Sequence, residues 1–234
     1  FRMSFFNDIG DSFYKSFIYD DRYLYFLEGI KNTLIIAFFA VLIGIFLGMI
    51  ISLIKDYNKE KNKLKILAKI CDFYVYVIRG TPVLLQLMIL YYVVFKTVDI
   101  PIVLVGVLTF GLNSAAYVSE IIRSGILSIG NGQKEAAKTL GLSYFQTMRY
   151  VIFPQVLQNM LPALGNEFIT LLKDTSVAGY IGIVELLKAS DIVSSRTYDY
   201  FFPLIVSALI YLFFTFLLVR FMRMLERKLN HVRS

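Results

Sequence analysis

Polar side chains that could bind a polar solute lie within a long apolar stretch of this sequence. Asn113, Tyr117 and Glu120 recur at helical spacing, so a helix would present them on one face, with Ser114 beside them. Ionisable and amide groups in such stretches are costly to bury and usually face a cavity or a protein partner. A substrate contact and a bond from Glu120 to a neighbouring helix are both consistent with this pattern.

A second polar group follows the end of a later apolar stretch. Asp174, Thr175 and Ser176 are adjacent in "LLKDTSVAGY", where a carboxylate could hold a cation and two hydroxyls could donate hydrogen bonds to an anion. Lys173 is the competing cation for Asp174, in which case the two would form an interfacial charge pair. Neighbouring helical residues point about 100° apart, so Lys173 is poorly aimed at that carboxylate.

Residues that support catalysis or metal binding are scarce. The chain has one cysteine, Cys71, and one histidine, His231, so it has no intrachain disulfide framework and is poorly supplied for a Ser-His or metal site. No Gly-Lys dipeptide occurs, so the chain has no Walker A phosphate-binding loop. We therefore expect no catalytic residue, no metal and no bound cofactor in this chain, and any ATP-derived energy must come from a partner.

The composition is that of an integral membrane protein: 57% of the 234 residues are hydrophobic, 18% are charged and the mean hydropathy is +0.65. Thr33 to Ile54 is uncharged and long enough to cross a hydrocarbon core of about 30 Å. Within it, Gly44 and Gly48 form a Gly-x-x-x-Gly pair that could permit close helix contact. We expect an all-α fold with a single domain over residues 1–234 and five spans at about 33–54, 66–95, 100–127, 151–172 and 201–219.

Lysine and arginine positions predict the orientation in the membrane. The 55–66 connection, the 123–150 segment and the C-terminal tail are basic, and alternating spans put all three on the cytoplasmic side. The opposite side receives an acidic N-terminal stretch with Asp8, Asp11, Asp20, Asp21 and Glu28. We expect an external N-terminus, a cytoplasmic C-terminus and no signal peptide. Phe1 ahead of Met3 indicates that the first two residues are a truncation edge or a remnant.

The second span is interrupted at "RGTP". Pro82 cannot donate a backbone hydrogen bond and Gly80 loosens the helix, so we expect a kink or an unwound turn beside a cavity. Arg79 could belong to a gate in the pathway or form a structural salt bridge with a carboxylate of another span. Arg79, Gly80 and Pro82 are therefore candidate gate and hinge residues.

The cytoplasmic loop at about 128–150 contains a segment that predicts a short polar helix. In "GNGQKEAAKTLGLSYFQTMRYVIFPQ", residues 130–155, Asn131 or Gly132 could cap this helix and Glu135 would lie in its first turn. Gly141 is placed to end it.

The same loop predicts a second short helix directly afterwards. Ser143 followed by Gln146 is a capping-box pattern, and the helix would run toward Pro154. Two helices around a glycine hinge form a small knob that is too short to have its own core. It is either a simple connector or a surface that buries its apolar side in a partner.

The segment "GQKEAAKTLGLSYFQTMRYVIFPQVLQNMLP" resembles the EAA loop of the membrane subunits of bacterial ATP-binding-cassette importers. The matching positions are Glu135, Ala136, Ala137, Gly141, Ile152 and Pro154. Further segments, "YVIRGTPVLLQLMILYY", "LNSAAYVSEIIRSGI", "GNEFITLLKDTSVAGYIGIVEL" and "ERKL", are similar to the polar amino-acid permease branch. One departure, "SIGNGQ", concerns the loop just before the knob.

The resemblance implies a permease of type I importer architecture in the bacterial cell membrane. Its coupling helix, with Glu135, Ala136, Ala137 and Gly141, would dock in a cleft on a cytoplasmic ATPase subunit that binds ATP and Mg²⁺. Two such permease subunits, identical or related, would form the pathway as a homodimer or heterodimer. A substrate-binding protein outside the membrane would deliver the substrate.

For an amino-acid substrate, the carboxylates of Asp174 and Glu120 would bind the ammonium group. The groups for the substrate carboxylate would be Thr175, Ser176 and Asn113, and Ser114 next to Asn113 is a further candidate for substrate binding. The alternative function is a secondary amino-acid transporter or a channel subunit, which would need no coupling helix. Copurification with an ATPase would separate these two classes.

Overall fold

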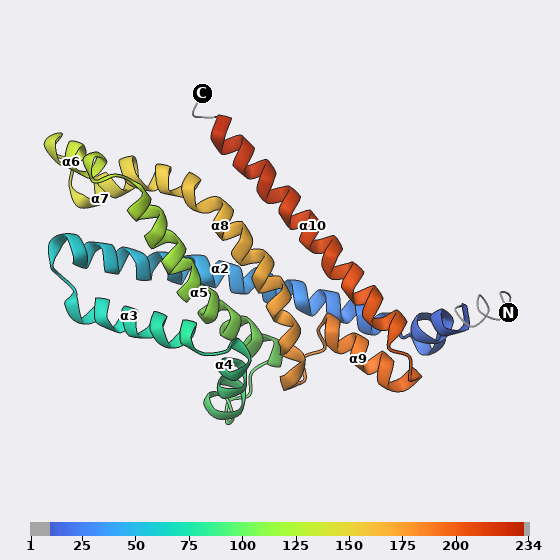
Figure 1. Ribbon diagram of the computed structural model, residues 1–234. Coiled ribbons are helices and arrows are strands. Elements are labelled where there is room, and N and C mark those ends of the chain that lie inside the picture. Colours follow the sequence, from blue (N-terminus) through green and yellow to red (C-terminus); the bar gives the residue numbers. More distant parts are fainter. Residues whose placement is uncertain (1–9, 232–234) are drawn as a thin grey trace. The chain divides into compact units, whose positions relative to one another are not determined.

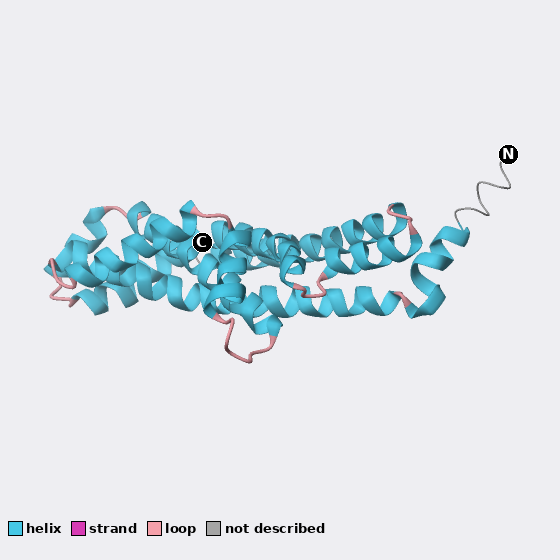
Figure 2. Ribbon diagram, turned by 90° about the horizontal axis from the view of Figure 1, so that it is seen from below, coloured by secondary structure: helices cyan, strands magenta, loops and turns pink. Residues whose placement is uncertain are grey.

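The computed structural model describes residues 10–231, and these form helices joined by short loops, with no strand in that range (Figure 2). The interpretation of Phe1 and Met3, and the charges of Asp8 and Arg233, lie outside the described residues. The chain divides into two compact units. One comprises Phe1–Ala40, Val83–Phe110 and Leu171–Phe216, and the other comprises Val41–Pro82, Gly111–Thr170 and Leu217–Ser234.

The chain folds into several long helices joined by shorter ones (Figure 1). The helices are α2 (Tyr23–Lys61), α3 (Lys65–Gly80), α4 (Val83–Ile89), α5 (Ile102–Ser128), α6 (Asn131–Thr139), α7 (Tyr144–Thr147), α8 (Phe153–Asp174), α9 (Leu186–Thr197) and α10 (Phe201–His231). Short π-helical segments, Tyr14–Ile18, Leu90–Val94 and Met148–Ile152, and 3-10 segments, Tyr19–Asp21 and Thr175–Ile181, complete the order.

Three of the described helices are long and apolar enough to cross a membrane, namely α2, α5 and α10. The pair α3 and α4, extended to Val94, adds a fourth candidate if the two are counted as one bent span. α8 is a continuous helix but does not meet the same apolar criterion, because one of its faces is polar, so five spans remain a prediction. α5 is 67% buried over its apolar window and α10 only 11%, so α10 has apolar surface free for lipid or a partner.

The break predicted at "RGTP" is present between α3 and α4. α3 ends at Gly80, Thr81 is extended, and α4 begins directly after Pro82. The Thr81 hydroxyl donates to the carbonyl oxygen of Val77 at 2.9 Å, which satisfies one acceptor released at the helix end. The interruption therefore has the local cause that the sequence indicated.

Within one unit, α2 packs against α5 through small residues. A Cβ added to Gly44 would meet the Ser114 side chain at 2.6 Å, and one added to Gly48 would meet Val118 at 2.8 Å. Side chains at these two positions would require α2 to move away, which typically costs about 1–3 kcal/mol. The Gly-x-x-x-Gly pair thus serves a contact within the chain.

Two buried clusters stabilise the units separately. In the same unit, Val118, Ile122 and Ile126 of α5 pack with Val156 and other residues of α8 and the knob. In the other unit, α9 packs on the N-terminal part of α2, with Phe17, Phe26, Leu186, Ala189 and Val193 at its centre. The side chains of each cluster are mainly apolar and buried, as expected for close interior packing.

Candidate functional site

The first knob helix, α6, ends as the sequence predicts. Gly141 has φ +76°, a left-handed conformation that favours glycine. Its N–H donates to the carbonyl oxygen of Lys138 at 2.9 Å, and the N–H of Leu142 donates to the carbonyl oxygen of Ala137 at 3.1 Å. This pair of bonds is a Schellman motif, which satisfies carbonyls at the helix C-terminus.

The predicted start of α6, with Asn131 or Gly132 as the N-cap, was wrong by one or two residues. Gly130 is the N-cap and Asn131 is already helical, so neither Asn131 nor Gly132 caps the helix. Glu135 consequently lies beyond the first turn, where the helix dipole has little effect on it. The reason is that Gly130 takes the extended N-cap conformation without any capping side chain.

The second knob helix, α7, starts with the predicted capping box. The Ser143 hydroxyl accepts from the N–H of Gln146 at 3.4 Å, and the Gln146 side chain accepts from the N–H of Ser143 at 2.8 Å. α7 is a single turn, followed by a π-helical segment that leads into α8. The knob is therefore held by local bonds at both helix boundaries and continues into α8.

The predicted coupling residues of the knob differ in their exposure to solvent. Glu135 and Ala136 are exposed, whereas Ala137 is buried. Two large apolar side chains, Leu140 at 80% and Phe145 at 73% exposure, flank the glycine hinge. The sequence analysis did not assign a contact role to Leu140 or Phe145. The available signal was an apolar residue before and after Gly141 in an otherwise polar loop.

The α5 residues predicted to contact substrate have protein partners. Asn113 and Ser114 are buried, and the Ser114 hydroxyl donates to Glu167 of α8 at 3.1 Å. Glu120 lies in an ion cluster in which Lys55 and Arg123 approach it at 2.9 and 2.7 Å. Glu120 therefore has the helix partners that the alternative interpretation described.

A pocket of about 390 Å³ opens beside this cluster, within the same unit. Its lining includes Arg79, Tyr117, Glu120 and Asn159. The Arg79 guanidinium lies 5.3 Å from the Tyr117 ring centre and 3.9 Å from Glu120. Pockets of this size accommodate small polar molecules, so the predicted gate residue and the Glu120 face share one hollow.

The Asp174 group belongs to the other unit. Thr175 is buried and its hydroxyl donates to the carbonyl oxygen of Leu172 at 2.7 Å. Asp174 and Ser176 are half-buried, and Lys173 is exposed. Within residues 10–231 no salt bridge joins Lys173 to Asp174, but the charge of Lys173 still acts on that carboxylate.

Glu185 is a buried polar residue that the sequence reasoning missed. Its carboxylate caps α9, accepting from the N–H groups of Leu187 and Lys188 at 2.7 and 2.6 Å, and the Tyr211 hydroxyl donates to it at 3.2 Å. Burial raises the pKa of Glu185 to about 7. It lines a pocket of about 610 Å³ that also contains Ser176. A single acidic residue before "LLKAS" was the available signal.

Long apolar helices, a capped polar knob between two of them and polar groups along α5 are typical of a membrane transport subunit. The sequence matches the family described as "Binding-protein-dependent transport system inner membrane component" over residues 40–231. The chain therefore belongs to this family, and it is the transmembrane permease subunit of an ABC importer.

Curated relatives cover nearly the whole chain. The putative glutamine transport system permease protein GlnP of Rickettsia bellii is 38% identical, over 90% of this chain and 95% of the relative. The arginine transport system permease protein ArtQ of Bacillus subtilis is 40% identical, over 88% and 93%.

Solved structures agree with the fold. The crystal structure of an amino acid ABC transporter with histidines superposes with a TM-score of 0.78 at 41% identity, covering 87% of this chain and 94% of that one. The MetNI methionine ABC transporter, at 18% identity, has a TM-score of 0.78 and supports the fold alone. The predicted all-α type I importer architecture and the resemblance to this permease family are confirmed, and a secondary transporter is not favoured.

Proposed function

We propose that this permease subunit moves a polar amino acid into the cell, using ATP hydrolysed by partner ATPase subunits. Relatives named for glutamine and arginine transport, each aligned over most of the chain, support the substrate class. The chain itself lacks a Walker A motif, so ATP and Mg²⁺ would bind to the partner and no catalytic step is assigned here.

The observation that carries the proposal is the doubly capped knob with exposed apolar side chains. Leu140 and Phe145 stand out from a polar surface beside Glu135 and Ala136, and Gly141 fixes the angle between the two helices. Exposed apolar groups rimmed by polar ones are typical of protein contacts. The cytoplasmic ATPase is the partner that would bury them.

Each predicted group of residues is proposed separately as a place where the substrate binds. Asp174 is half-buried and forms no salt bridge among the described residues, although the charge of Lys173 acts on it; this supports a role in holding the substrate ammonium, with Thr175 and Ser176 beside it. Asn113, Ser114 and Glu120 remain candidates, with Glu120 acting through the pocket that it shares with Arg79. Gly80 and Pro82 would let α3 and α4 move as a hinge.

We further propose a single permease domain with five spans in the bacterial cytoplasmic membrane, with the N-terminus outside. It would pair with a second permease subunit, identical or related, and receive substrate from an extracellular or periplasmic binding protein. The basic 55–66 connection and the acidic N-terminal stretch support this orientation.

The test is purification through a tag on this chain, followed by reconstitution into liposomes with ATP inside. An ATPase should copurify, and labelled glutamine, arginine or histidine should accumulate only with hydrolysable ATP. A copurified ATPase that carries a substituted Walker A lysine provides the control. Uptake that persists with this inactive ATPase and is abolished by an ionophore would instead support a secondary transporter.

A further inference from the structure

We infer that Asp56 and Glu60, at the C-terminal end of α2, are positioning residues that clamp the coupling knob to the first membrane helix. This inference rests on the proposed docking of the knob to an ATPase. Through this clamp, a movement of the knob would be transmitted to α2. All the residues concerned lie in one compact unit.

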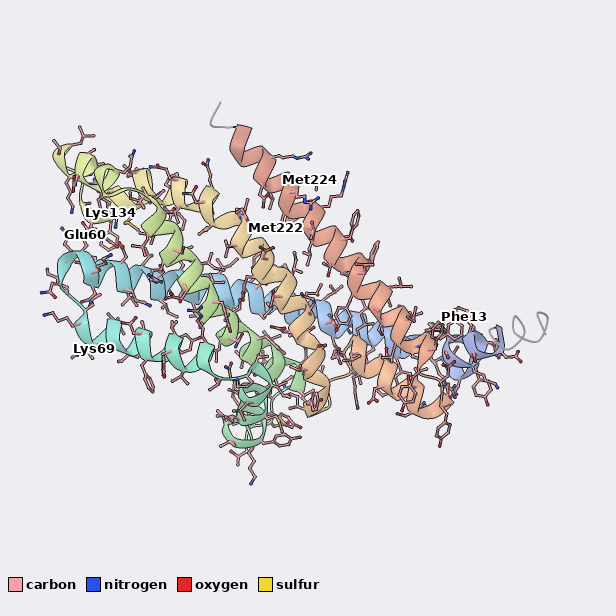
Figure 3. All side chains as sticks on the ribbon, viewed as in Figure 1. Phe13, Glu60, Lys69, Lys134, Met222 and Met224 are labelled. Atoms are coloured by element: carbon pink, nitrogen blue, oxygen red, sulfur yellow. The ribbon has the colours of Figure 1, made fainter. Side chains whose placement is uncertain are left out.

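The clamp consists of ion pairs between α2 and α6. Lys134 approaches Asp56 at 3.2 Å and Glu60 at 3.7 Å, and Lys138 approaches Glu60 at 3.0 Å. Figure 3 shows Glu60 and Lys134 facing each other from the two helices. The side chains of Asp56, Glu60 and Lys134 are 11%, 15% and 18% exposed, so solvent screens them less than ordinary surface pairs.

The second knob helix joins the same end of α2. The Tyr144 hydroxyl donates to Asp56 at 2.9 Å, and Tyr57 lies edge-on to the Tyr144 ring with centres 5.0 Å apart. Tyr57 also stacks near Phe145 at 6.1 Å. Burial, together with the Asp56 carboxylate, raises the pKa of Tyr144, so its hydroxyl stays protonated and able to donate.

The connectivity explains why these contacts matter for coupling. α5 precedes the knob and α8 follows it along the chain, so both are joined to it through the backbone. α2 has no such link and contacts the knob through side chains alone, across 78 to 88 residues of sequence. Loss of the ion pairs should therefore loosen α2 from the knob, leaving the apolar contacts of Leu53 and Tyr57, while α5 and α8 stay joined to the knob through the backbone.

The test measures transport and ATP hydrolysis separately in the reconstituted complex. In Glu60→Lys, the amount of substrate moved per ATP should fall about three- to fivefold, the change expected for loss of a partly shielded ion pair. Copurification of the ATPase should be unchanged, because Glu60 lies on α2, outside the knob, and its side chain is only 15% exposed. Glu28→Gln, an exposed carboxylate at the other end of α2, is the matched control and should keep the wild-type ratio.

Reciprocal exchange makes the test specific. Lys138→Glu should lower the ratio as Glu60→Lys does, and the double variant should recover it. An unchanged ratio in Glu60→Lys, or a double variant no better than either single one, would overturn the clamp. If Glu60→Lys fails to assemble, Glu60→Gln and Tyr144→Phe give the same comparison with smaller changes. Absence of ATP-driven uptake in the wild type and in Glu28→Gln would instead refute the proposed function itself.

Discussion

Replacing Gly141 by valine should uncouple the permease from its ATPase. Gly141 holds φ +76°, and an L-residue in the left-handed region costs about 1–2 kcal/mol, more for a β-branched side chain. If the backbone relaxes instead, the two Schellman hydrogen bonds at Ala137 and Lys138 are weakened, at about 0.5–1.5 kcal/mol each. A cost of about 2 kcal/mol lowers the population of the correctly ended knob by about 30-fold.

The same substitution at Gly132 is the matched control. Gly132 is inside α6 with no atom within 4 Å of an added Cβ. Glycine and valine differ by less than about 0.5 kcal/mol in helix propensity, so Gly132→Val should be close to neutral. The two variants therefore separate a backbone requirement from the mere addition of a side chain to the knob.

The assay is ATPase copurification together with substrate-stimulated ATP hydrolysis after reconstitution. We expect both to drop in Gly141→Val, with the chain still inserted in the membrane, and both to be retained in Gly132→Val. Normal values in Gly141→Val would show that the hinge is not part of the ATPase contact. A loss in both variants would show that added bulk, not the left-handed turn, disturbs docking.

Three further predictions concern topology, substrate binding and protonation. Single cysteines at Ser12 and Asn62, in a Cys71→Ala background, should label from opposite sides of the membrane; labelling from one side would exclude five alternating spans. Asp174→Asn should weaken substrate binding by about 1.5–3 kcal/mol, raising the half-saturating concentration about ten- to hundredfold, with ATPase assembly and basal hydrolysis retained. An unchanged concentration dependence would make that carboxylate structural. Because the folded pKa of Glu185 is raised to about 7, the unfolded chain binds fewer protons between about pH 5 and 7, and stability should fall as pH rises through this window. Thermal unfolding in detergent should show this slope in the wild type and a flatter one in Glu185→Gln; equal slopes would contradict the assignment.

The features predicted correctly depend on residues close together in sequence. The break at Gly80 and Pro82, the left-handed Gly141 and the Ser143 capping box follow from backbone chemistry over a few positions. The N-cap of α6 was missed because Gly130 caps without a side chain, and such a cap leaves little trace in the sequence.

The features that could not be predicted depend on packing between distant segments. Glu120 is bound by Lys55, which is 65 residues away, and Asp56 by Lys134, which is 78 residues away. Periodicity identifies the face of a helix but not its neighbour. The polar face of α5 was therefore recognised, whereas the cations that pair with Glu120 became known only from the structure.

The clamp also constrains the order in which the protein is built. Synthesis proceeds from the N-terminus, so Asp56 and Glu60 leave the ribosome well before Lys134 and Tyr144, with α3, α4 and α5 made in between. The local caps of the knob can form as soon as residues 130–147 emerge, whereas the clamp closes only after the intervening helices have turned back to the same side. The clamp contacts therefore belong to a late step in the assembly of this unit, after α5 and the knob have been made.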